Sequence, residues 1–313
     1  MKPDHVTIIG LGVMGADIAA IFIANGCDVD AVQPDPEEAA VRQAAVQNAV
    51  EQLGITGPKG VLRTVRSYAE VAVDRTALVI ECVPENLALK RKVFTEVLEA
   101  TPSSVPVVSN ASGYRISDIT EGLEGAERTA GMHFFLPAHL VPLVEVVKGE
   151  RTDDAVMDRL VACMSAVGRA PVRVNRDTPG FLANRIQHAL MREAFAVIDE
   201  GLATPEDVDT AVRFGFGFRY VAAGPILQKE MAGLDTQLEA GRTIYPGLCA
   251  SATPSPGLQK LVDDGRHGMK NGAGFWQWPP EQADAVRRAY NEILVEAARL
   301  LRRSPLEGVT LKP

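Results

Sequence analysis

The first half of the chain alternates short runs of apolar, often β-branched residues with longer stretches of helical periodicity. The short runs predict strands at Val6–Ile9, Val29–Val32, Ala77–Glu81, Val105–Ser109, Thr129–His133 and Pro171–Val174. The helical stretches cover residues 14–25, 87–99 and 153–167, and a further helix starts at residues 36–38, where a proline precedes two acidic residues. Strands that alternate with helices in this way are typical of an α/β fold with a doubly wound parallel sheet.

The pattern changes after Asp177. Thr178 is a suitable N-cap residue and Pro179 follows it, so we expect a long helix that ends near Gly201. Residues 204–207, Thr-Pro-Glu-Asp, repeat the same start signal, and no convincing strand follows them. The sequence therefore predicts a Rossmann-like domain over residues 1–177 and an all-α C-terminal domain over residues 178–313.

A glycine-rich turn joins the first predicted strand to the first predicted helix. It reads Gly10-Leu11-Gly12-Val13-Met14-Gly15. In such a turn the first glycine permits the tight bend, the second lets the backbone approach a pyrophosphate, and the third allows close helix packing. The alternative is a tight turn without a ligand, but the flanking strand and helix favour dinucleotide binding.

The end of the second predicted strand bears on the choice of dinucleotide. An acidic residue usually binds the ribose 2′-hydroxyl there, whereas this chain has Gln33. An amide also hydrogen-bonds a hydroxyl, and the nearby Asp35 would repel the 2′-phosphate of NADP. No Arg or Lys follows closely enough to favour that phosphate. We therefore expect the cofactor to be NAD.

Composition excludes several classes of protein. The chain has 313 residues and a net charge of −8, which argues against nucleic acid as the partner because phosphate binding needs a basic face. No apolar run is long enough to span a bilayer, and the first residues lack a signal-peptide pattern, so we expect no membrane partner. The 4 cysteines contain no C-x-x-C pair, which favours free thiols in a reducing cytoplasm over disulfides or a metal site.

One acidic residue, Glu145, interrupts the apolar run 143–147, which otherwise has the composition of a buried strand. A buried carboxylate is costly unless another group pairs with it. His133 is the nearest candidate partner, and histidine titrates near neutral pH, so the pair suits proton transfer. His139 is a competitor for the role of base.

Several blocks, in order along the chain, resemble the 3-hydroxyacyl-CoA dehydrogenase family. Besides the glycine turn they are ECVPENLALK (81–90), SNAS (109–112), GMHFFLP (131–137) with LVEVV (143–147), DTPGFLANR (177–185) and GRHGMKNGAGFWQW (265–278). The resemblance implies an NAD-dependent oxidoreductase that acts on a small molecule. It also implies a homodimer that forms through the C-terminal domain, since members of the family commonly dimerise.

The resemblance further implies roles for single residues. His133 and Glu145 would be the catalytic pair, while Ser112 and Asn184 would contact the substrate at the reacting carbon. Near the nicotinamide ribose we expect Glu85, Lys90 and Asn110. His139 would be a loop or substrate-contact residue. Considered singly, most of these residues also fit ordinary structural roles: a helix-surface pair for Glu85 and Lys90, a turn for Asn110 and Ser112, and a solvent-facing helix position for Asn184.

Departures from the family pattern bear on the substrate. Leu136 stands where the family usually has asparagine, and the stretch between Gln33 and Glu81 is short for a member that holds CoA. GFGFRYVAAGP (215–225) contains Arg219 and is similar to the branch that includes λ-crystallin/L-gulonate 3-dehydrogenase and L-carnitine dehydrogenase. We therefore expect a small 3-hydroxy acid as substrate, with Arg219 binding its free carboxylate through a planar fork of N–H donors.

Three alternatives remain at this point. The chain could be an L-3-hydroxyacyl-CoA dehydrogenase that acts on CoA thioesters. It could also be a non-catalytic NAD-binding protein with a structural or sensor role, although an intact His133 and Glu145 argue against that. Arg219 could be a structural arginine that caps a helix or pairs with an acid across a dimer.

Overall fold

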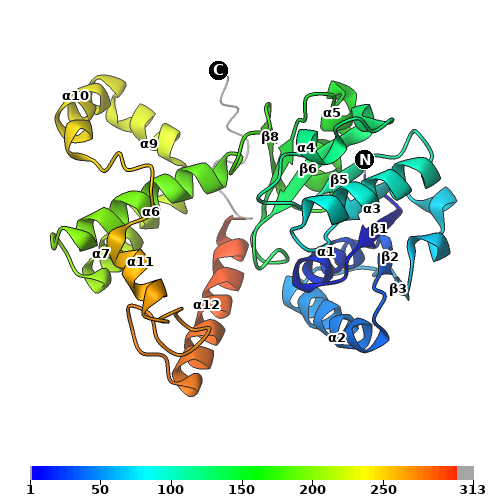
Figure 1. Ribbon diagram of the computed structural model, residues 1–313, viewed down its shortest axis with the longest axis horizontal. Coiled ribbons are helices and arrows are strands. Elements are labelled where there is room, and N and C mark those ends of the chain that lie inside the picture. Colours follow the sequence, from blue (N-terminus) through cyan, green and yellow to red (C-terminus); the bar gives the residue numbers. More distant parts are fainter. Residues whose placement is uncertain (1, 302–313) are drawn as a thin grey trace. The chain divides into compact units, whose positions relative to one another are not determined.

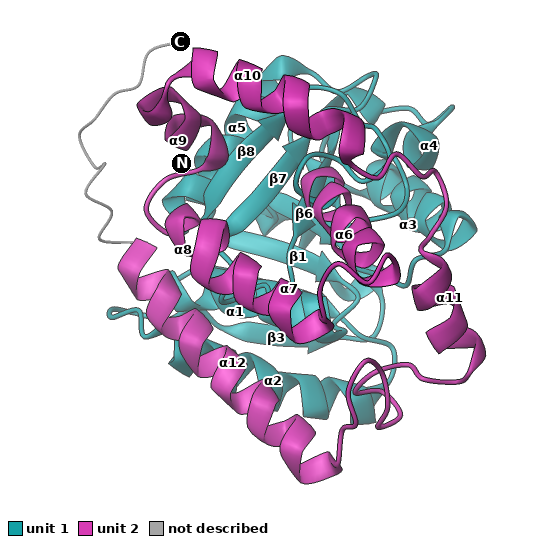
Figure 2. Cartoon of the chain, turned by 90° about the vertical axis from the view of Figure 1, so that its left-hand side faces the viewer, with its two compact units in different colours: residues 1–184 teal, residues 185–313 magenta. Residues whose placement is uncertain are grey.

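The chain divides into two compact units, residues 1–184 and residues 185–313 (Figure 2). The structure is a computed structural model and describes residues 2–301. The domain boundary expected after Asp177 lies a few residues before this division. Residues 302–313 of the expected helical domain lie outside the described residues.

Unit 1 alternates strands and helices along the chain (Figure 1). Its strands are β1 (His5–Ile9), β2 (Asp28–Val32), β3 (Leu62–Val65), β4 (Leu78–Glu81), β5 (Val107–Ser109), β6 (Thr129–Phe134), β7 (Leu143–Val147) and β8 (Ala170–Val174). Its helices are α1 (Val13–Ala24), α2 (Pro36–Leu53), α3 (Leu87–Ala100), α4 (Ile116–Thr120) and α5 (Asp154–Ala166).

The strands form one sheet in the order β3-β2-β1-β4-β5-β6-β7-β8. Neighbours from β3 to β6 are parallel, which confirms the doubly wound parallel sheet. The last two strands differ from the expectation, because β7 is antiparallel to β6 and β8 is parallel to β7. The reason is the short connection 135–142, since a parallel return requires a longer crossover. The sequence does not predict β3, whose four residues include Arg63 and Thr64.

Two apolar cores cover the two faces of the sheet. On one face α1, α2 and α5 bury residues such as Ile18, Val46 and Met157 against the strands. On the other face α3 and α4 contribute Phe94 and Ile119. The strands are therefore held from both sides, which leaves their carboxyl ends as the edge where parallel sheets of this kind bind ligands.

Helix α6 (Ala183–Asp199) begins later than the sequence predicts. Thr178 does not cap it, and residues 178–182 form turns in which Phe181 N donates to Thr178 O at 2.9 Å. Gly180 and Phe181 both have positive φ, at +78° and +45°, which is incompatible with a right-handed helix through this segment. The expected helix start at Pro179 is therefore wrong.

Unit 2 contains helices and turns, as expected from the sequence. After α6 its helices are α7 (Pro205–Ala211), α8 (Gly217–Tyr220), α9 (Pro225–Ala232), α10 (Leu234–Ile244), α11 (Pro256–Asp263) and α12 (Pro280–Leu301). Thr204 caps α7 as predicted, because its hydroxyl accepts a hydrogen bond from Asp207 N and the Asp207 carboxylate accepts one from Thr204 N. No helix among residues 2–301 is long and apolar enough to cross a membrane.

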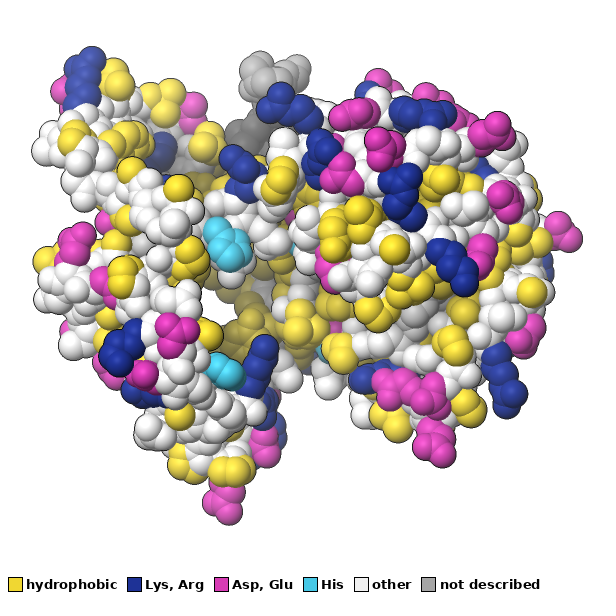
Figure 3. Space-filling view, viewed as in Figure 1, with side chains coloured by type: hydrophobic (Ala, Val, Ile, Leu, Met, Phe, Trp, Pro, Cys, Tyr) yellow, Lys and Arg dark blue, Asp and Glu magenta, His cyan; other side chains and the backbone are white. Residues whose placement is uncertain are grey.

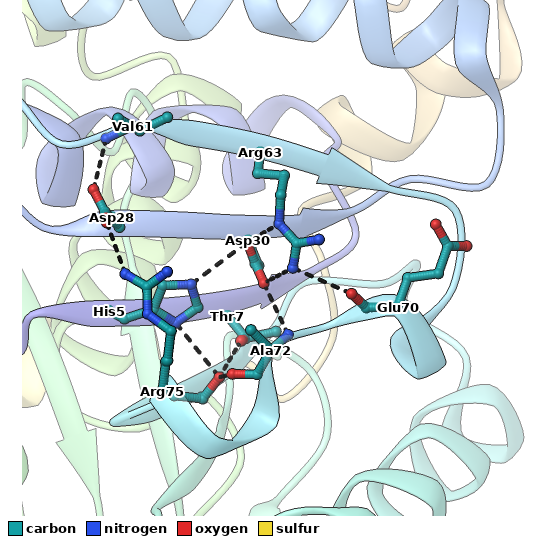
Figure 4. Close-up of polar contacts among 10 residues, drawn as sticks. His5, Thr7, Asp28, Asp30, Val61, Arg63, Glu70, Ala72 and Arg75 are labelled. Carbon is teal, nitrogen blue, oxygen red and sulfur yellow. Dashed lines mark hydrogen bonds and ion pairs between the residues drawn. The ribbon is translucent and has the colours of Figure 1, made fainter.

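A buried carboxylate on β2, Asp30, joins the outer strands of unit 1 (Figure 4). Its oxygens accept from Arg63 Nε at 2.8 Å, from Arg63 Nη2 and from Ala72 N at 3.1 Å. His5 Nε2 lies 3.4 Å from Asp30 Oδ1. Burial alone would raise the pKa of Asp30, but the hydrogen bonds from Arg63 and Ala72 and the charge of His5 hold that pKa below its usual value.

We predict that Asp30→Asn lowers the free energy of unfolding at neutral pH by about 1.5–3 kcal/mol, the usual contribution of hydrogen bonds to a charged group. The folded-state pKa of Asp30 is lowered, so its stabilising effect is complete above the ordinary value of 3.8 and is lost as the pH falls through the lower folded value. The difference between wild type and variant, measured by urea unfolding, should therefore shrink in acid. Glu96→Gln, which removes an exposed partner of Lys92, is the control and should change little.

Candidate active site

The glycine turn between β1 and α1 has the geometry of a dinucleotide-binding turn. Gly10 has φ of +98°, and a Cβ there would lie 2.7 Å from Cys82 O. A Cβ on Gly15 would lie 2.1 Å from Gly10 O, so this glycine permits the close approach of helix and strand. Nothing lies within 4 Å of the position that a Cβ on Gly12 would take, and no side chain caps α1.

The start of α1 therefore fits the diphosphate of a dinucleotide. The N–H groups of Val13 and Met14 belong to its first turn, where backbone donors have no intrahelical acceptor. The positive end of the helix dipole adds to the attraction for an anion. Gly12, Val13 and Met14 are the residues that would hold the diphosphate.

Gln33 lies next to this turn, directly after β2. Its Nε2 donates to Leu11 O at 3.4 Å, and its Oε1 accepts from Asp35 N at 3.3 Å. Asp35 caps α2, because its Oδ1 accepts from Glu37 N at 2.9 Å and from Glu38 N at 3.3 Å. A fixed amide and a fixed carboxylate thus stand where a ribose is expected, which suits the hydroxyls of NAD better than a 2′-phosphate.

Three polar side chains form a buried cluster at the carboxyl ends of β4 and β5. Lys90 Nζ donates to Glu81 Oε1 at 2.9 Å and to Val83 O at 3.2 Å. Ser109 Oγ donates to Glu81 Oε2 at 2.6 Å. Lys90 is 1% exposed and Glu81 is 0% exposed, so the two charges neutralise each other inside the protein. Lys90 therefore holds Glu81 and the backbone of Val83 in place from the protein interior and is not exposed at the surface of the site.

Glu85 connects this cluster to the loop that carries Ser112. Glu85 Oε2 lies 3.2 Å from Lys90 Nζ, and Oε1 accepts from Ser112 N at 3.2 Å and Gly113 N at 2.6 Å. Asn110 is held as well, since its N–H donates to Glu81 O and its Oδ1 accepts from Phe134 N, both at 2.9 Å. These contacts fix the loop and leave the exposed Ser112 hydroxyl for another partner.

His133 and Glu145 meet across the antiparallel pair β6 and β7, where they occupy directly opposite positions. His133 Nδ1 lies 2.7 Å from Glu145 Oε2. The Phe135 ring contacts the imidazole edge-on with centroids 4.5 Å apart, and the Phe181 ring lies at 5.5 Å. The carboxylate therefore fixes the ring orientation and occupies Nδ1, so Nε2 is the nitrogen left to exchange a proton with a ligand.

The second oxygen of Glu145 holds the start of α6. Glu145 Oε1 accepts from Leu182 N at 2.9 Å and from Ala183 N at 2.7 Å. Asn184 follows directly, so this contact positions its side chain relative to the His133–Glu145 pair. The positive φ of Phe181, in the turn that brings these amides to Glu145, is a strained conformation of the kind that concentrates at functional sites.

Glu145 is fully buried and nevertheless stays ionised. Burial would raise the pKa of its carboxyl, but the hydrogen bonds from His133, Ala183 N and Leu182 N and the charge of His133 keep that pKa below its usual value. A fixed negative charge at Nδ1 stabilises the imidazolium that forms when His133 takes a proton. The pair can therefore act as a general base and, in reverse, as a general acid.

His139 does not compete for the role of base. It is buried, with Nδ1 3.0 Å from Asp17 Oδ1 and Nε2 2.8 Å from Gln52 Oε1. Both ring nitrogens thus face protein groups, and this geometry gives no support to the expected substrate contact. Leu136, three residues after His133, is instead 62% exposed.

Arg219 belongs to unit 2, in α8, and lines a pocket of about 680 Å³ formed by that unit alone. Apolar side chains such as Phe218, Met231 and Leu300 form most of its wall, and Lys229 and Gln228 also line it. Among the described residues neither Arg219 nor Lys229 has an acidic partner. The two cations therefore remain available to an anion.

Some residues of the site were outside the reach of the sequence patterns. Glu81 ends an apolar strand, as Glu145 interrupts one, and that shared feature is the signal that could have identified it. Asp17 and Phe181 carry no comparable signal. Asp17 lies within an apolar helix, and the special feature of Phe181 is its backbone conformation.

Two family models cover most of the chain. The 3-hydroxyacyl-CoA dehydrogenase NAD binding domain matches residues 5–178, and the 3-hydroxyacyl-CoA dehydrogenase C-terminal domain matches residues 180–278. The first match includes the glycine turn, Gln33 and the His133–Glu145 pair. The second begins just before α6.

Relatives with different substrates are similar to the chain. It is 32% identical over 302 residues to 5-formyl-3-hydroxy-2-methylpyridine 4-carboxylate 5-dehydrogenase of Mesorhizobium japonicum, covering 95% of this chain and 98% of the relative. A solved structure of an enzyme with that activity matches with a TM-score of 0.90 over 97% of this chain and 100% of the other, at 30% identity. L-Carnitine dehydrogenase of Streptomyces griseus is 40% identical over 73% of this chain and 70% of the relative. Human mitochondrial hydroxyacyl-coenzyme A dehydrogenase is 32% identical over 88% of this chain and 91% of the relative.

Proposed function

The chain belongs to the 3-hydroxyacyl-CoA dehydrogenase family and is an NAD-dependent oxidoreductase, and we propose that its substrate is a small 3-hydroxy acid with a free carboxylate. The observation that carries the proposed substrate class is the pair of cations, Arg219 and Lys229, which have no acidic partner among the described residues and line a mostly apolar pocket. A guanidinium binds a carboxylate through two parallel N–H donors, so Arg219 is the residue assigned to the substrate carboxylate.

The chemistry of oxidation divides between cofactor and protein. NAD, when bound, accepts the hydride from the carbon that bears the hydroxyl. His133 Nε2 takes the hydroxyl proton, and the charge of Glu145 stabilises the resulting imidazolium. Ser112 and Asn184 donate hydrogen bonds to the substrate oxygen as it changes from hydroxyl to carbonyl. In the direction of reduction, His133 returns the proton.

Overall similarity also supports a small acid over a CoA thioester. The structural match with TM-score 0.90 is to an enzyme whose substrate is named as a pyridine carboxylate. Solved 3-hydroxybutyryl-CoA dehydrogenases, such as that of Ralstonia eutropha, match with a TM-score of 0.71 over 89% of the chain. Between Gln33 and Glu81 the chain forms a single α-helix, α2, together with β3 and two short 3₁₀ turns, and no second α-helix that could complete a hairpin.

The same match favours a second candidate within this class. The named substrate of that enzyme carries an aldehyde on the ring beside its carboxylate. An aromatic aldehyde acid is therefore the alternative substrate to test beside the aliphatic 3-hydroxy acids, and acetoacetyl-CoA represents the thioester branch.

We propose that the protein is a homodimer that associates through unit 2. Among residues 185–301 only Gly241, Gly274 and Ala283 are buried, so the described part of this unit has no large apolar residue in a core of its own. Ile226 is 75% exposed and Leu238 is 56% exposed. Figure 3 shows hydrophobic side chains at the surface of unit 2, in the region that α9 and α10 occupy in Figure 1. A second copy that covers this surface would supply the missing core.

We also propose that the enzyme works in the reducing cytoplasm. All four cysteines, Cys27, Cys82, Cys163 and Cys249, are free, which is the usual state in that compartment.

The activity is tested by NAD reduction with a panel of 3-hydroxy acids, L-carnitine, the aromatic aldehyde acid and, in the reverse direction, acetoacetyl-CoA. We expect a free acid to give the highest kcat/KM, and His133→Ala to lower kcat on it by about 10²–10⁴, the usual contribution of a general base. His267→Ala, in unit 2, is the control and should leave kcat unchanged. Near-normal turnover in His133→Ala would contradict the assignment of the base.

Arg219→Met should lower kcat/KM for an acid substrate about 10–150-fold, because a charge-assisted contact contributes about 1.5–3 kcal/mol. The loss should be much smaller for the amide or ester of the same compound, and the KM for NAD should not change. Arg213→Met, which removes a nearby arginine outside the pocket, serves as the control. Equal losses on charged and uncharged substrates would show that Arg219 supports the fold instead of binding the carboxylate.

Sedimentation equilibrium tests the dimer. We expect a dimer for the wild type and weaker association for Ile226→Asp, because the new charge would have to be buried in the interface. Val41→Asp places the same charge at a position on α2 of unit 1 that is 60% exposed, and it should leave the dimer intact. A monomeric wild type would contradict the proposal.

A further inference from the structure

The loop 135–142 connects β6, which carries His133, to β7, which carries Glu145. Hydrogen bonds fix the conformation of this loop at several points. Leu140 N and Val141 N both donate to Pro137 O, at 3.1 and 3.0 Å. Ala138 is fully buried. A loop that lies between two site residues and is tied down in this way presents its exposed side chains in a defined position.

Asp17, on α1, accepts a hydrogen bond from this loop with one carboxylate oxygen and places the other oxygen close to the His139 ring. Oδ2 accepts from Ala138 N at 2.8 Å, and Oδ1 lies 3.0 Å from His139 Nδ1. The side chains of His139 and Asp17 are 10% and 13% exposed, so water screens the contact only weakly. Asp17 is two residues after Gly15, so the same helix that opens at the glycine turn also fixes the loop.

Two further groups complete the cluster. Gln52, near the end of α2, places Oε1 2.8 Å from His139 Nε2. Arg169, between α5 and β8, donates from Nη1 to His139 O at 3.1 Å and to Ala138 O at 3.4 Å. Side chains from three separate parts of unit 1 thus converge on the two residues Ala138 and His139.

The consequence concerns Leu136. Single exposed leucines are common on protein surfaces and by themselves indicate nothing. Here the leucine is 62% exposed, comes three residues after His133 in the sequence, and precedes a segment that hydrogen bonds with Asp17 and Arg169 hold in place. Its side chain is apolar and follows the carboxyl end of β6, so it offers van der Waals contact and no hydrogen bond to a ligand bound at this strand end.

We propose that Leu136 is a specificity-determining residue that contacts an apolar part of the substrate, and that Asp17 and His139 are positioning residues that hold it there. The inference deepens the proposed function and rests on it, because it assumes a substrate whose free carboxylate is bound elsewhere and whose remaining surface near His133 is apolar. Asp17 and His139 act only through the loop and do not touch substrate.

A double-mutant cycle tests the coupling on the best acid substrate. Leu136→Ala should lower kcat/KM about 10-fold, the usual effect of a lost apolar contact. His139→Gln should lower it to a similar extent in the wild-type background and by less than about 2-fold in the Leu136→Ala background, because no side chain then remains to be positioned. The affinity for NAD should stay within about 2-fold throughout. Asp17→Asn, which keeps the shape of the side chain, repeats the cycle if His139→Gln folds poorly, and Val41→Ala controls for loss of an exposed apolar side chain.

The proposal would be overturned if His139→Gln lowered kcat/KM by the same factor in the wild-type and Leu136→Ala backgrounds. That result would show that His139 supports the fold and not the position of Leu136. An unchanged kcat/KM in Leu136→Ala would overturn it as well. If the wild type prefers acetoacetyl-CoA, the proposed substrate class fails separately, and the same cycle measured on acetoacetyl-CoA still decides whether the two residues act together.

Discussion

The carboxylate of Glu145 is the interaction on which the candidate site depends. One oxygen holds His133 Nδ1, and the other accepts the backbone amides of Leu182 and Ala183 at the start of α6. A fully buried carboxylate is tolerated only when such partners replace water, and here each partner is part of the site. A single side chain therefore fixes the orientation of His133, the proposed base, and the backbone directly before Asn184, the proposed substrate contact.

The rest of unit 1 supports this arrangement. The antiparallel register of β6 and β7 places His133 opposite Glu145, and the short connection that causes the reversal also carries Leu136. On the neighbouring strands the buried Lys90 neutralises Glu81 and holds Glu85, whose other oxygen fixes the loop with Ser112. His133 on β6 and Ser112 after β5 therefore lie at the carboxyl ends of adjacent strands, where doubly wound sheets bind their ligands.

Much of the fold follows from the sequence, because β-branched runs, the glycine turn and the capping residues act locally. β3 could not be predicted, since Leu62-Arg63-Thr64-Val65 is short and half polar. Its Arg63 pairs with Asp30 on the neighbouring strand β2, a contact that only the tertiary structure reveals. The start of α6 could not be predicted either. Thr178 and Pro179 satisfy every local rule for a helix start, but the groups that determine the actual start lie on Glu145, more than 30 residues earlier in the chain. The same limit applies to the site. The pairing of His133 with Glu145 could be predicted from the types of the two residues, whereas the burial of Lys90 and the contact between Asp17 and His139 depend on tertiary structure.

Hydrogen exchange of the Leu182 and Ala183 amides tests the central role of Glu145 most directly. The measurement compares the wild type with Glu145→Ala and His133→Ala. If the carboxylate holds both the base and the helix, exchange at these two amides should accelerate about 10-fold or more in Glu145→Ala, as expected for loss of hydrogen bonds to a charged acceptor, and should stay close to the wild-type rate in His133→Ala. Unchanged protection of both amides in Glu145→Ala would contradict the account, because the start of α6 would then be held by other groups.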